Sequence, residues 1–445
     1  MISFPQRNFA SSQVRHFFLA ARCVFAAISA LSVATSRANE PSELNGDVII
    51  QWNQLLTETA RVPGLHPATI RVERSYSMLH VAMFDAVNAI ERRYTSFLFD
   101  GQASSGASEV AACAQAAHDI LTALYPSRQP IYDAALAATL AAIPAGRAQQ
   151  GANIGATVAA QVLVWRSSDR WDAVPPAYAP PELPGYWQPT PPSFGTAVFT
   201  HFPDVVPFAI ESGTQFVAPP PPFLNSADYA EAFNEAKRLG AKNSTDRTAD
   251  QTLVANLHAS VGTRATPISV WNGIARDVSR SQALGLVDTA RLFALLNVAF
   301  LDAVQTSFAG KYGYHLWRPV TAIRRAGEDL NPATDPDPEW QPLLSSPRYP
   351  TYPGNAAALS AASARILARF FGTDAIAFDV FFEPTDPAIN PNGWTRSYSS
   401  FWQCADEQAR SRVYGGIHFT FDSVASQQSA VELADWVFEC TLVPR

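Results

Sequence analysis

The sequence predicts an all-α protein made of two helical halves joined by a long proline-rich connection. Apolar residues recur at helical spacing through most of the chain, and several segments are rich in alanine, which favours close packing of helices. One short strand is predicted, at Phe378–Phe382, and no repeat of fixed period stands out. We therefore expect one helical half at residues 39–170, the connection at 171–224 and a second helical half at 225–445.

In the N-terminal half, capping residues and helix breakers mark the ends of the predicted helices. Asp47 is predicted to cap the first helix, which Pro63 and Gly64 would end. His80, Asp85 and His118 are single polar groups on apolar segments, and we interpret them as hydrogen-bonded core or interface residues rather than ligands. The predicted helices are 48–61, 70–94, 108–124, 130–142 and 146–165.

The helical pattern breaks at residues 171–223. This stretch holds 14 of the 34 prolines, which helix interiors exclude, together with aromatic residues that favour an ordered path. We expect an ordered connection that is draped over the helical body, either on its side or across the mouth of a cleft.

In the C-terminal half, Ser226 is predicted to cap a helix, and Thr248 with Gln251 has the pattern of a capping box. A strongly apolar helix is predicted to end near Lys311. The predicted helices are 226–239, 248–258, 267–281, 288–311, 356–371, 401–414 and 423–439.

The composition excludes several classes of protein. Apolar residues make up 47% of the chain and charged residues 16%, which is typical of a chain with a large core rather than a disordered one. The formal net charge is −7 and no basic stripe is visible, so the sequence does not indicate nucleic-acid binding. A cluster of cations in such a chain therefore points to a local anion site.

The N-terminus has the pattern of a secretory signal peptide. Basic residues precede an apolar run of twelve, and Ser36 and Ala38 suit the −3 and −1 positions of a cleavage site. We expect residues 1–38 to be removed and the mature protein to be exported, to the periplasm or the medium. An uncleaved membrane anchor is the alternative, although the run is short for a span.

Later features indicate no further span and no disulfide framework. The most apolar later segment is interrupted by Asn297 and Asp302, so no membrane span is expected in the mature chain. Three cysteines remain after the signal peptide. Either Cys404 and Cys440 form one bridge, or the thiols are free and buried.

Two groups of basic residues in the C-terminal half point to chemistry. Lys311 and Arg318 are seven residues apart, and Pro319 follows. A lysine supplies a compact charge and an arginine a planar fork for two oxygens, so the pair suits an oxyanion. The chain lacks G-x-S-x-G, H-E-x-x-H, C-x-x-C and the P-loop pattern, which excludes the familiar serine hydrolases, zinc proteases and P-loop enzymes.

The second group is Arg412, His418 and Asp422, with Gly415 and Gly416 between the arginine and the histidine. The glycines are predicted to end one helix and to let the next begin at His418, where free backbone N–H groups attract anions. His418 and Asp422 would then share one helical face, and the carboxylate would orient the imidazole. Taken singly, each residue is an ordinary surface arginine or core histidine; together they indicate an oxyanion site.

These motifs, K-x6-R-P and S-R-x5-H-x3-D, resemble those of the vanadium-dependent haloperoxidase and type 2 phosphatidic acid phosphatase superfamily. The first motif of the family is Lys311, Arg318 and Pro319, its third motif begins at Ser411, and its second motif, P-S-G-H, lies between them. The contexts LWRPVTAIR, RVYGGIHF and VERSYSMLHVAMFDAVNAIERRY resemble the soluble bacterial haloperoxidase branch. The resemblance covers most of the chain after Asp47 and implies a helix-bundle core.

The resemblance implies a role for each residue of the two motifs. Lys311, Arg318 and Arg412 would hold the oxygens of vanadate, or of phosphate in the same site. His418 would be the axial vanadium ligand in a peroxidase, or the phosphate-accepting nucleophile in a phosphatase. Asp422 would hold the ring of His418.

The chain departs from the family's P-S-G-H motif, where it has Pro353, Gly354, Asn355 and Ala356. Without a gap, Ala356 replaces the histidine and Gly354 and Asn355 take the oxyanion-binding positions; with one deletion, Asn355 replaces the histidine. Neither residue titrates, and general acid–base help is worth roughly 10²–10⁴-fold. His315, inside the first motif, is the candidate replacement acid, unless it points away.

The implied function is a vanadium haloperoxidase, which oxidises halide with hydrogen peroxide and passes the product to an organic acceptor. A phosphatase that acts on phosphate esters through His418 is one alternative, and a relative that binds an oxyanion without turnover is another. The length and the absence of later membrane spans favour the first, because the lipid phosphatases of the superfamily span membranes.

Overall fold

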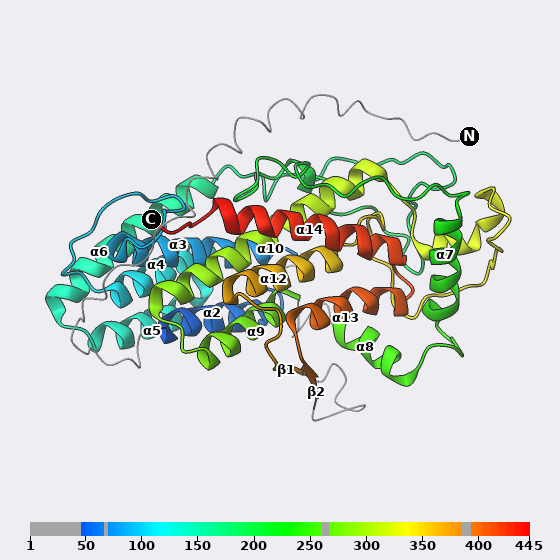
Figure 1. Ribbon diagram of the computed structural model, residues 1–445. Coiled ribbons are helices and arrows are strands. Elements are labelled where there is room, and N and C mark those ends of the chain that lie inside the picture. Colours follow the sequence, from blue (N-terminus) through cyan, green and yellow to red (C-terminus); the bar gives the residue numbers. More distant parts are fainter. Residues whose placement is uncertain (1–45, 66–69, 260–266, 384–392) are drawn as a thin grey trace. The chain divides into compact units, whose positions relative to one another are not determined.

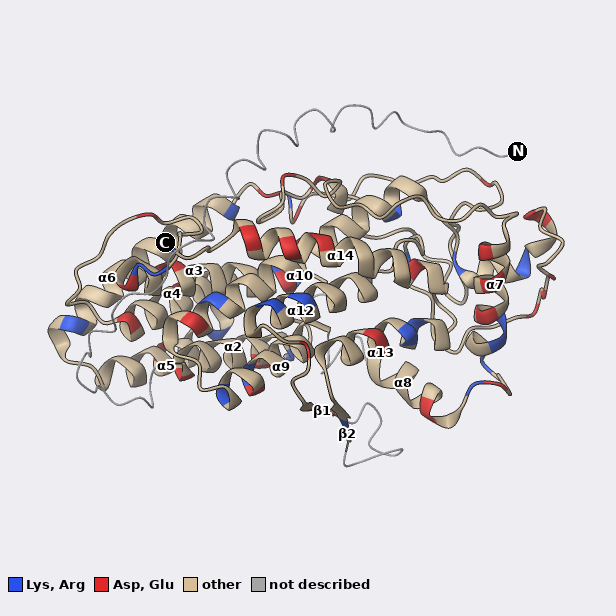
Figure 2. Ribbon diagram, in the orientation of Figure 1, with Lys and Arg blue, Asp and Glu red and all other residues tan. Residues whose placement is uncertain are grey.

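Helices dominate the computed structural model of this chain, which describes residues 46–65, 70–259, 267–383 and 393–445 (Figure 1). The chain divides into a unit Met1–Ser42 and a unit Glu43–Arg445. The predicted signal peptide and its cleavage site lie outside the described residues. The all-α fold class is confirmed, whereas the boundaries at residues 170 and 224 stay a prediction. Figure 2 shows basic and acidic positions interspersed over the labelled helices.

The helices of the first half are α2 (Asp47–Ala60), α3 (Glu73–Glu91), α4 (Glu109–Leu124), α5 (Gln129–Ala141) and α6 (Ala145–Arg166). The later ones are α7 (Ala227–Gly240), α8 (Ala249–Ala259), α9 (Pro267–Ser281), α10 (Leu286–Tyr314), α11 (Pro319–Arg324), α12 (Asn355–Phe371), α13 (Phe401–Tyr414) and α14 (Thr420–Cys440). The short 3-10 turns are η1 (Pro126–Arg128), η2 (Phe202–Asp204) and η3 (Ala326–Glu328).

Side-chain caps begin some of the helices. The Ser226 hydroxyl accepts a hydrogen bond from Tyr229 N, and Thr248 and Gln251 exchange the two bonds of a capping box at 2.9 and 3.1 Å. The predicted cap at Asp47 is wrong, because Gly46 is the N-cap and Asp47 already lies in the first turn. The acidic side chain there still interacts favourably with the helix dipole.

One hairpin and one short helix escaped the sequence analysis. The predicted strand β1 (Phe378–Phe382) forms an antiparallel pair with β2 (Trp394–Tyr398), whose alternation of large and small residues is too short to stand out. Helix α11 has six residues, fewer than periodicity can reveal.

The long helix α10 lies at the centre of the fold and packs against α3, α12 and α14 (Figure 1). We expected no later segment to be long and apolar enough to cross a bilayer. This is wrong, because helix Leu286–Tyr314 has the length and the composition of a membrane span. However, 94% of its most apolar window is buried inside the protein. Core packing therefore accounts for its apolar sequence.

The structure reveals a relation between the two halves that the search for a fixed period missed. Helices α2 and α9 share a buried Trp-Asn pair, Trp52–Asn53 in one and Trp271–Asn272 in the other. Helices α3 and α10 share the pattern L-x-V-A-x-x-D-A-V, at residues 79–87 and 296–304. The first half therefore contains a counterpart of the α9–α10 pair, and two copies some 217 residues apart are too few to show as a periodic repeat.

The matching positions meet in one buried polar network. Asn53 Nδ2 donates to Asn272 Oδ1 at 2.7 Å and lies 2.8 Å from His80 Nε2. Asn297, which matches His80, bonds to Asn272 in both directions at 2.8 and 3.0 Å. These bonds join α2, α3, α9 and α10, so His80, which we predicted to be structural, is part of a network that holds the two halves together.

Acid is expected to weaken the protein partly through His80. Burial and the neighbouring Arg276 lower the pKa of His80 to about 3, against roughly 6.5 in an unfolded chain. Between these values the unfolded chain binds a proton that the folded protein does not, so stability falls with pH by at most about 1.4 kcal/mol per unit. His80→Asn, which copies Asn297, should flatten the fall of the urea unfolding free energy between pH 6.5 and 4.5.

His118→Asn is the control of opposite sign. The neighbouring Asp119 and Asp133 raise the pKa of His118, so its contribution is present at low pH and lost as pH rises. Equal slopes for the wild type and His80→Asn would show that His80 is not kept neutral in the folded protein.

The proline-rich connection is ordered and is hydrogen-bonded to the helical body at several points. On α10, the Asp302 carboxylate accepts hydrogen bonds from the backbone N–H groups of residues 208, 209 and 210 at 2.8–3.1 Å. Earlier in the connection, Trp187 N donates to His315 O at 2.7 Å, and Val198 N donates to Arg348 O at 3.0 Å. The connection therefore runs across the first motif, as expected of a covering segment.

The cysteines form no bridge of the kind considered above. Cys113 and Cys404 are buried free thiols, so the Cys404–Cys440 disulfide is wrong. The expectation that all three thiols are buried is also wrong, because Cys440 is exposed at the end of α14.

Candidate active site

Five elements far apart in the sequence bring the predicted site residues together. Lys311 lies in the last turn of α10, and Arg318 is the N-cap of α11. Arg412 lies in the last turn of α13, and His418 lies between α13 and α14. The set is completed by Asp422 in the first turn of α14 and by Gly354 and Asn355 at the start of α12.

His418 is held on both sides of its ring. Its Nδ1 lies 2.8 Å from Asp422 Oδ2 and 3.2 Å from Thr351 Oγ1, and its Nε2 lies 3.1 Å from Arg318 Nη1. A guanidinium can only donate, so Nε2 is the acceptor nitrogen and Nδ1 carries the proton that it donates to Asp422. Burial, followed by the charges of Arg318, Lys311 and Arg412, keeps the pKa of His418 well below its usual value. The ring is therefore neutral, with its lone pair on Nε2.

The pairing of His418 with Asp422 arises differently from the prediction. A shared helical face is wrong, because α14 begins at Thr420 and His418 precedes it. Asp422 Oδ2 instead reaches back from the first turn, where it accepts from Phe419 N at 3.0 Å and from Thr351 Oγ1 at 2.5 Å. Burial is the largest influence on the carboxyl and raises the pKa of Asp422 to about 6. The predicted turn before it is confirmed, with Gly415 as C-cap and Gly416 at φ 71°.

Arg318 presents an unused donor. Its Nε donates to Tyr349 O at 2.9 Å and its Nη1 to Ile417 O at 2.8 Å, while its Nη2 is buried without a partner among the described residues. Burial lowers the pKa of Arg318 to about 10. The guanidinium is thus fixed by backbone carbonyls, with one N–H group available for an anion.

Arg412 is buried with still fewer partners. Its residue is 9% exposed, and no hydrogen bond to its guanidinium is present among the described residues. Burial is the main cause that lowers its pKa. A planar fork of donors in this state is prepared for a bidentate oxyanion.

Lys311 differs from the two arginines. Its fully buried Nζ donates to three backbone carbonyls, Pro350 O at 3.1 Å, Thr351 O at 2.8 Å and Pro353 O at 2.5 Å. These bonds use all three protons of the ammonium group. Burial and Arg318 lower the pKa of Lys311, and Asp422 acts in the opposite direction.

Two further residues belong to this cluster that the sequence analysis missed. The ring centroid of Tyr349 lies 5.2 Å from Lys311 Nζ and 5.0 Å from Arg318 Cζ. Thr351 joins His418 to Asp422 through its hydroxyl. Both precede the altered second motif by only a few residues, and no residue type there signals a role without the fold.

The second motif, residues 353–356, leads into α12, and the choice between the ungapped and the gapped comparison stays a prediction. Gly354 is the N-cap, and Asn355 and Ala356 are the first two helical residues. A Cβ on Gly354 would lie 3.1 Å from Asp422 O, so a serine there would have to displace the backbone that carries Asp422. Asn355 is 8% exposed and its Oδ1 is buried without a partner among the described residues. No titratable side chain stands at Gly354, Asn355 or Ala356.

His315 is placed at the C-cap of α10 with φ 59°, beneath the proline-rich connection. Its Nδ1 lies 2.8 Å from the Tyr178 hydroxyl, and its ring stacks on Tyr178 and Tyr186. These contacts are with the connection rather than with His418. A role for His315 as the acid stays a prediction.

The charges of this cluster do not balance, which tests the fit of an oxyanion. The charges of three buried cations, Lys311, Arg318 and Arg412, act on His418, whereas the cluster has one buried carboxylate, Asp422. Arg318 contacts His418 Nε2 through Nη1 and has its Nη2 without a partner among the described residues. Buried unpaired cations are costly unless an anion compensates them. The residues present therefore fit a multiply charged tetrahedral oxyanion such as vanadate or phosphate, with His418 Nε2 as the one atom able to form a direct bond.

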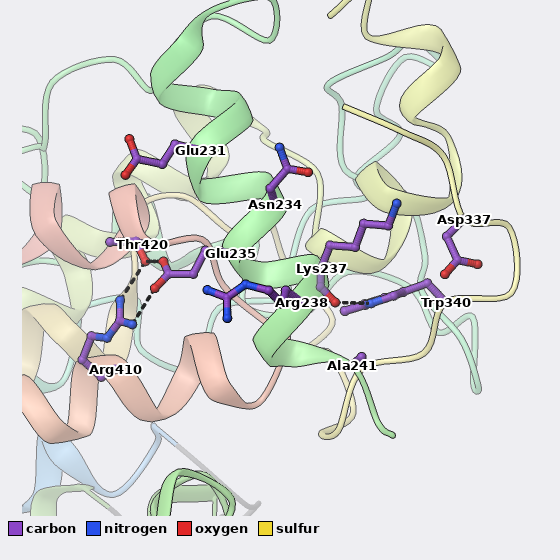
Figure 3. Close-up of a pocket in the computed structure, with 10 residues that line it drawn as sticks. All are labelled: Glu231, Asn234, Glu235, Lys237, Arg238, Ala241, Asp337, Trp340, Arg410 and Thr420. Atoms are coloured by element: carbon purple, nitrogen blue, oxygen red, sulfur yellow. Dashed lines mark hydrogen bonds and ion pairs between the residues drawn. The ribbon is translucent and has the colours of Figure 1, made fainter. Parts of the chain in front are cut away.

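A pocket is lined by residues close in sequence to two members of this cluster. It has a volume of about 840 Å³ and is formed by α7, the start of α14, the end of α13 and the segment around Trp340 (Figure 3). At its wall, Glu235 binds both Arg410 and Thr420, which are two residues from Arg412 and His418 (Figure 3). None of the predicted site residues lines it among the described residues.

Comparisons with known proteins point to one group of enzymes. The chain is 28% identical over 279 residues to vanadium chloroperoxidase of Curvularia inaequalis, a match that covers 49% of this chain and 45% of that protein. It therefore spans less than half the length of this curated relative. A bacterial vanadium-dependent iodoperoxidase structure matches 92% of this chain and 99% of its own, with a TM-score of 0.76 and 23% identity. A holo-type bacterial vanadium-dependent chloroperoxidase matches 89% and 97%, with a TM-score of 0.70 and 16% identity.

Fold and site together define an all-α protein whose C-terminal half holds buried cations around an aspartate-bound histidine. Residues 291–442 match the family model described as the VCPO second helical-bundle domain. This match and the likeness to vanadium chloroperoxidase support the vanadium-dependent haloperoxidase superfamily for this chain.

Proposed function

We propose that this protein is a vanadium-dependent haloperoxidase that oxidises halide with hydrogen peroxide at a vanadate bound to His418. The observation that carries the proposal is the neutral His418 ring, whose Nε2 contacts Arg318, an arginine with its Nη2 buried and without a partner among the described residues. The vanadium-dependent enzymes among the relatives support the same cofactor.

Each residue has a defined task in this proposal. Arg318 Nη2 and the Arg412 guanidinium bind the oxygens and offset their charge, while Asp422 and Thr351 fix the His418 ring with its proton on Nδ1. Bound vanadate would act as a Lewis acid towards peroxide. Asn355 and the first backbone N–H groups of α12 add polar contacts on another side.

A second function is favoured by one specific observation. Halide oxidation to hypohalous acid consumes a proton, and no titratable side chain stands at the start of α12. The protein would then bind vanadate or phosphate with little or no turnover. A phosphatase that uses His418 as the nucleophile would lack the same acid.

One set of assays separates these functions. Purified protein is given vanadate, peroxide and bromide with a dye that can be brominated, and separately a chromogenic phosphate ester. Vanadate-dependent bromination that is lost in Arg412→Ala supports the peroxidase, and ester hydrolysis that vanadate inhibits supports the phosphatase. Silence in both assays with vanadate bound supports the binding protein, whereas no binding of vanadate or phosphate excludes the oxyanion site itself.

The proposal includes export from the cytoplasm, on the strength of the N-terminal pattern. Cell fractionation with mass spectrometry of the mature N-terminus tests it. A mature chain that begins after Ala38 in the periplasm or medium supports export, and a retained Met1 in the cytoplasm contradicts it.

A further inference from the structure

Lys311 stands apart from the other cations of the cluster in what it binds. Its ammonium group gives its three protons to the carbonyls of Pro350, Thr351 and Pro353, at 2.5–3.1 Å. Arg318 and Arg412, in contrast, keep donors without partners among the described residues. The two arginines therefore have hydrogen-bond donors available for an anion and Lys311 does not, although the sequence motifs imply the same role for all three cations.

The segment that Lys311 binds is the one that builds the rest of the site. In residues 349–353, Tyr349 O accepts a hydrogen bond from Arg318 Nε. The Thr351 hydroxyl donates to Asp422 and lies 3.2 Å from His418 Nδ1. Gly354 N then donates to Asp422 O at 3.0 Å, and α12 begins at Asn355. The backbone of this segment thus determines where Thr351 and the start of α12 lie.

We propose that Lys311 is a positioning residue in this protein: it holds the segment 350–353 through its carbonyls, and Arg318 and Arg412 make the direct contacts with the oxyanion. This departs from the role that the sequence resemblance implies for Lys311. It rests on the oxyanion site of the proposed function, but not on turnover. Lys311 acts on the anion through Thr351, Asn355 and the helix start.

The physical argument concerns which groups are satisfied before an anion binds. A buried carbonyl that loses its hydrogen-bond donor destabilises the folded protein by its desolvation cost. Removal of the Lys311 ammonium group would leave three carbonyls in this state. A guanidinium without partners carries that cost itself, and an anion relieves it. Removal of Lys311 and removal of Arg412 are therefore expected to change stability in opposite directions when no anion is present.

The first test compares Lys311→Met with Arg412→Met in buffer free of phosphate, sulfate and vanadate. Lys311→Met should lower the Tm, because it leaves three buried carbonyls without a donor, whereas Arg412→Met should leave the Tm unchanged or raise it. Millimolar phosphate should raise the Tm of the wild type and not that of Arg412→Met. Lys242→Met, at an exposed lysine, is the matched control and should behave as the wild type.

The second test needs no destabilised variant, because the chain contains only three lysines, at positions 237, 242 and 311. In protein labelled with ¹⁵N at the lysine Nζ, Lys311 should give a slowly exchanging ammonium signal without any anion. Addition of phosphate should leave its shift almost unchanged. Lys237→Arg and Lys242→Arg assign the remaining signals.

The outcomes separate this inference from the proposed function. A Lys311 signal that appears or moves strongly only with phosphate, or a Lys311→Met variant as stable as Arg412→Met without anion, would overturn the positioning role. A wild type whose Tm ignores phosphate and vanadate would overturn the oxyanion site, while the ¹⁵N signal would still decide what Lys311 binds.

Discussion

His418→Ala is expected to reduce vanadate-dependent bromination by at least roughly 100-fold. Altering a residue that only supports a metal ligand costs about 10–100-fold, and loss of the ligand itself should cost no less. The reason is visible in the cluster, where Nε2 of His418 is the lone-pair nitrogen that faces Arg318 at 3.1 Å. The measurement is the bromination rate as a function of vanadate concentration, which reports both affinity and turnover.

Two variants calibrate this result. Asp422→Asn should give a smaller loss, of roughly 10–100-fold, because the ring keeps its place but loses the carboxylate that fixes its proton on Nδ1. His118→Asn, at a histidine held between two aspartates outside the site, should retain full activity. Full activity in His418→Ala would show that vanadate binds elsewhere or not at all.

Ala356→His is expected to raise turnover by roughly 10²–10⁴-fold, the usual contribution of a general acid. In the structure Gly354 is the N-cap of α12, and Asn355 and Ala356 are the first two residues of the helix. A Cβ built on Gly354 would lie 3.1 Å from the backbone oxygen of Asp422. A histidine at position 356 would restore a side chain that can donate the proton that halide oxidation consumes. The measurement is the bromination rate against pH at saturating vanadate, with vanadate affinity followed in parallel.

A comparison of histidine at positions 355 and 356 tests which residue of this chain replaces the family's histidine. Under the ungapped comparison, in which Ala356 replaces the histidine, Asn355→His should gain less than Ala356→His. Ala356→Gln supplies a polar side chain of similar size that cannot titrate, and it should show no gain. Equal rates for Ala356→His and the wild type, with vanadate bound equally well, would mean that another group already donates the proton, and Tyr178-bonded His315 would be tested next.

The periodicity and capping patterns were sufficient to predict most helices. Helices α9 and α13 have the predicted bounds, and the Ser226 cap and the Thr248–Gln251 capping box form as expected. These features depend on neighbours a few residues apart, which is why local sequence determines them. The misplaced cap at Asp47 and the missed α11 lie where the local signal is only a turn long.

Contacts across long separations could not be predicted in the same way. Thr351 and Asp422 are 71 residues apart, and Lys311 and Pro353 are 42 apart, yet both pairs are hydrogen-bonded. The same holds for the Asn53–Asn272 bond that links the two halves. Nothing in the residues around Thr351 distinguishes it from an ordinary loop threonine.

The sequence by itself determined the helical class, the proline-rich connection, and the spacing of Lys311, Arg318, Arg412, His418 and Asp422, because motif spacing and helical periodicity are local properties of a chain. Only the tertiary structure decided what each of these side chains binds. In the folded protein Lys311 donates to three carbonyls, whereas Arg318 and Arg412 have donors without partners among the described residues. The Thr351 hydroxyl contacts both His418 and Asp422. The physical reason is that hydrogen-bond partners of buried groups are chosen by packing, which brings together residues that the sequence keeps far apart.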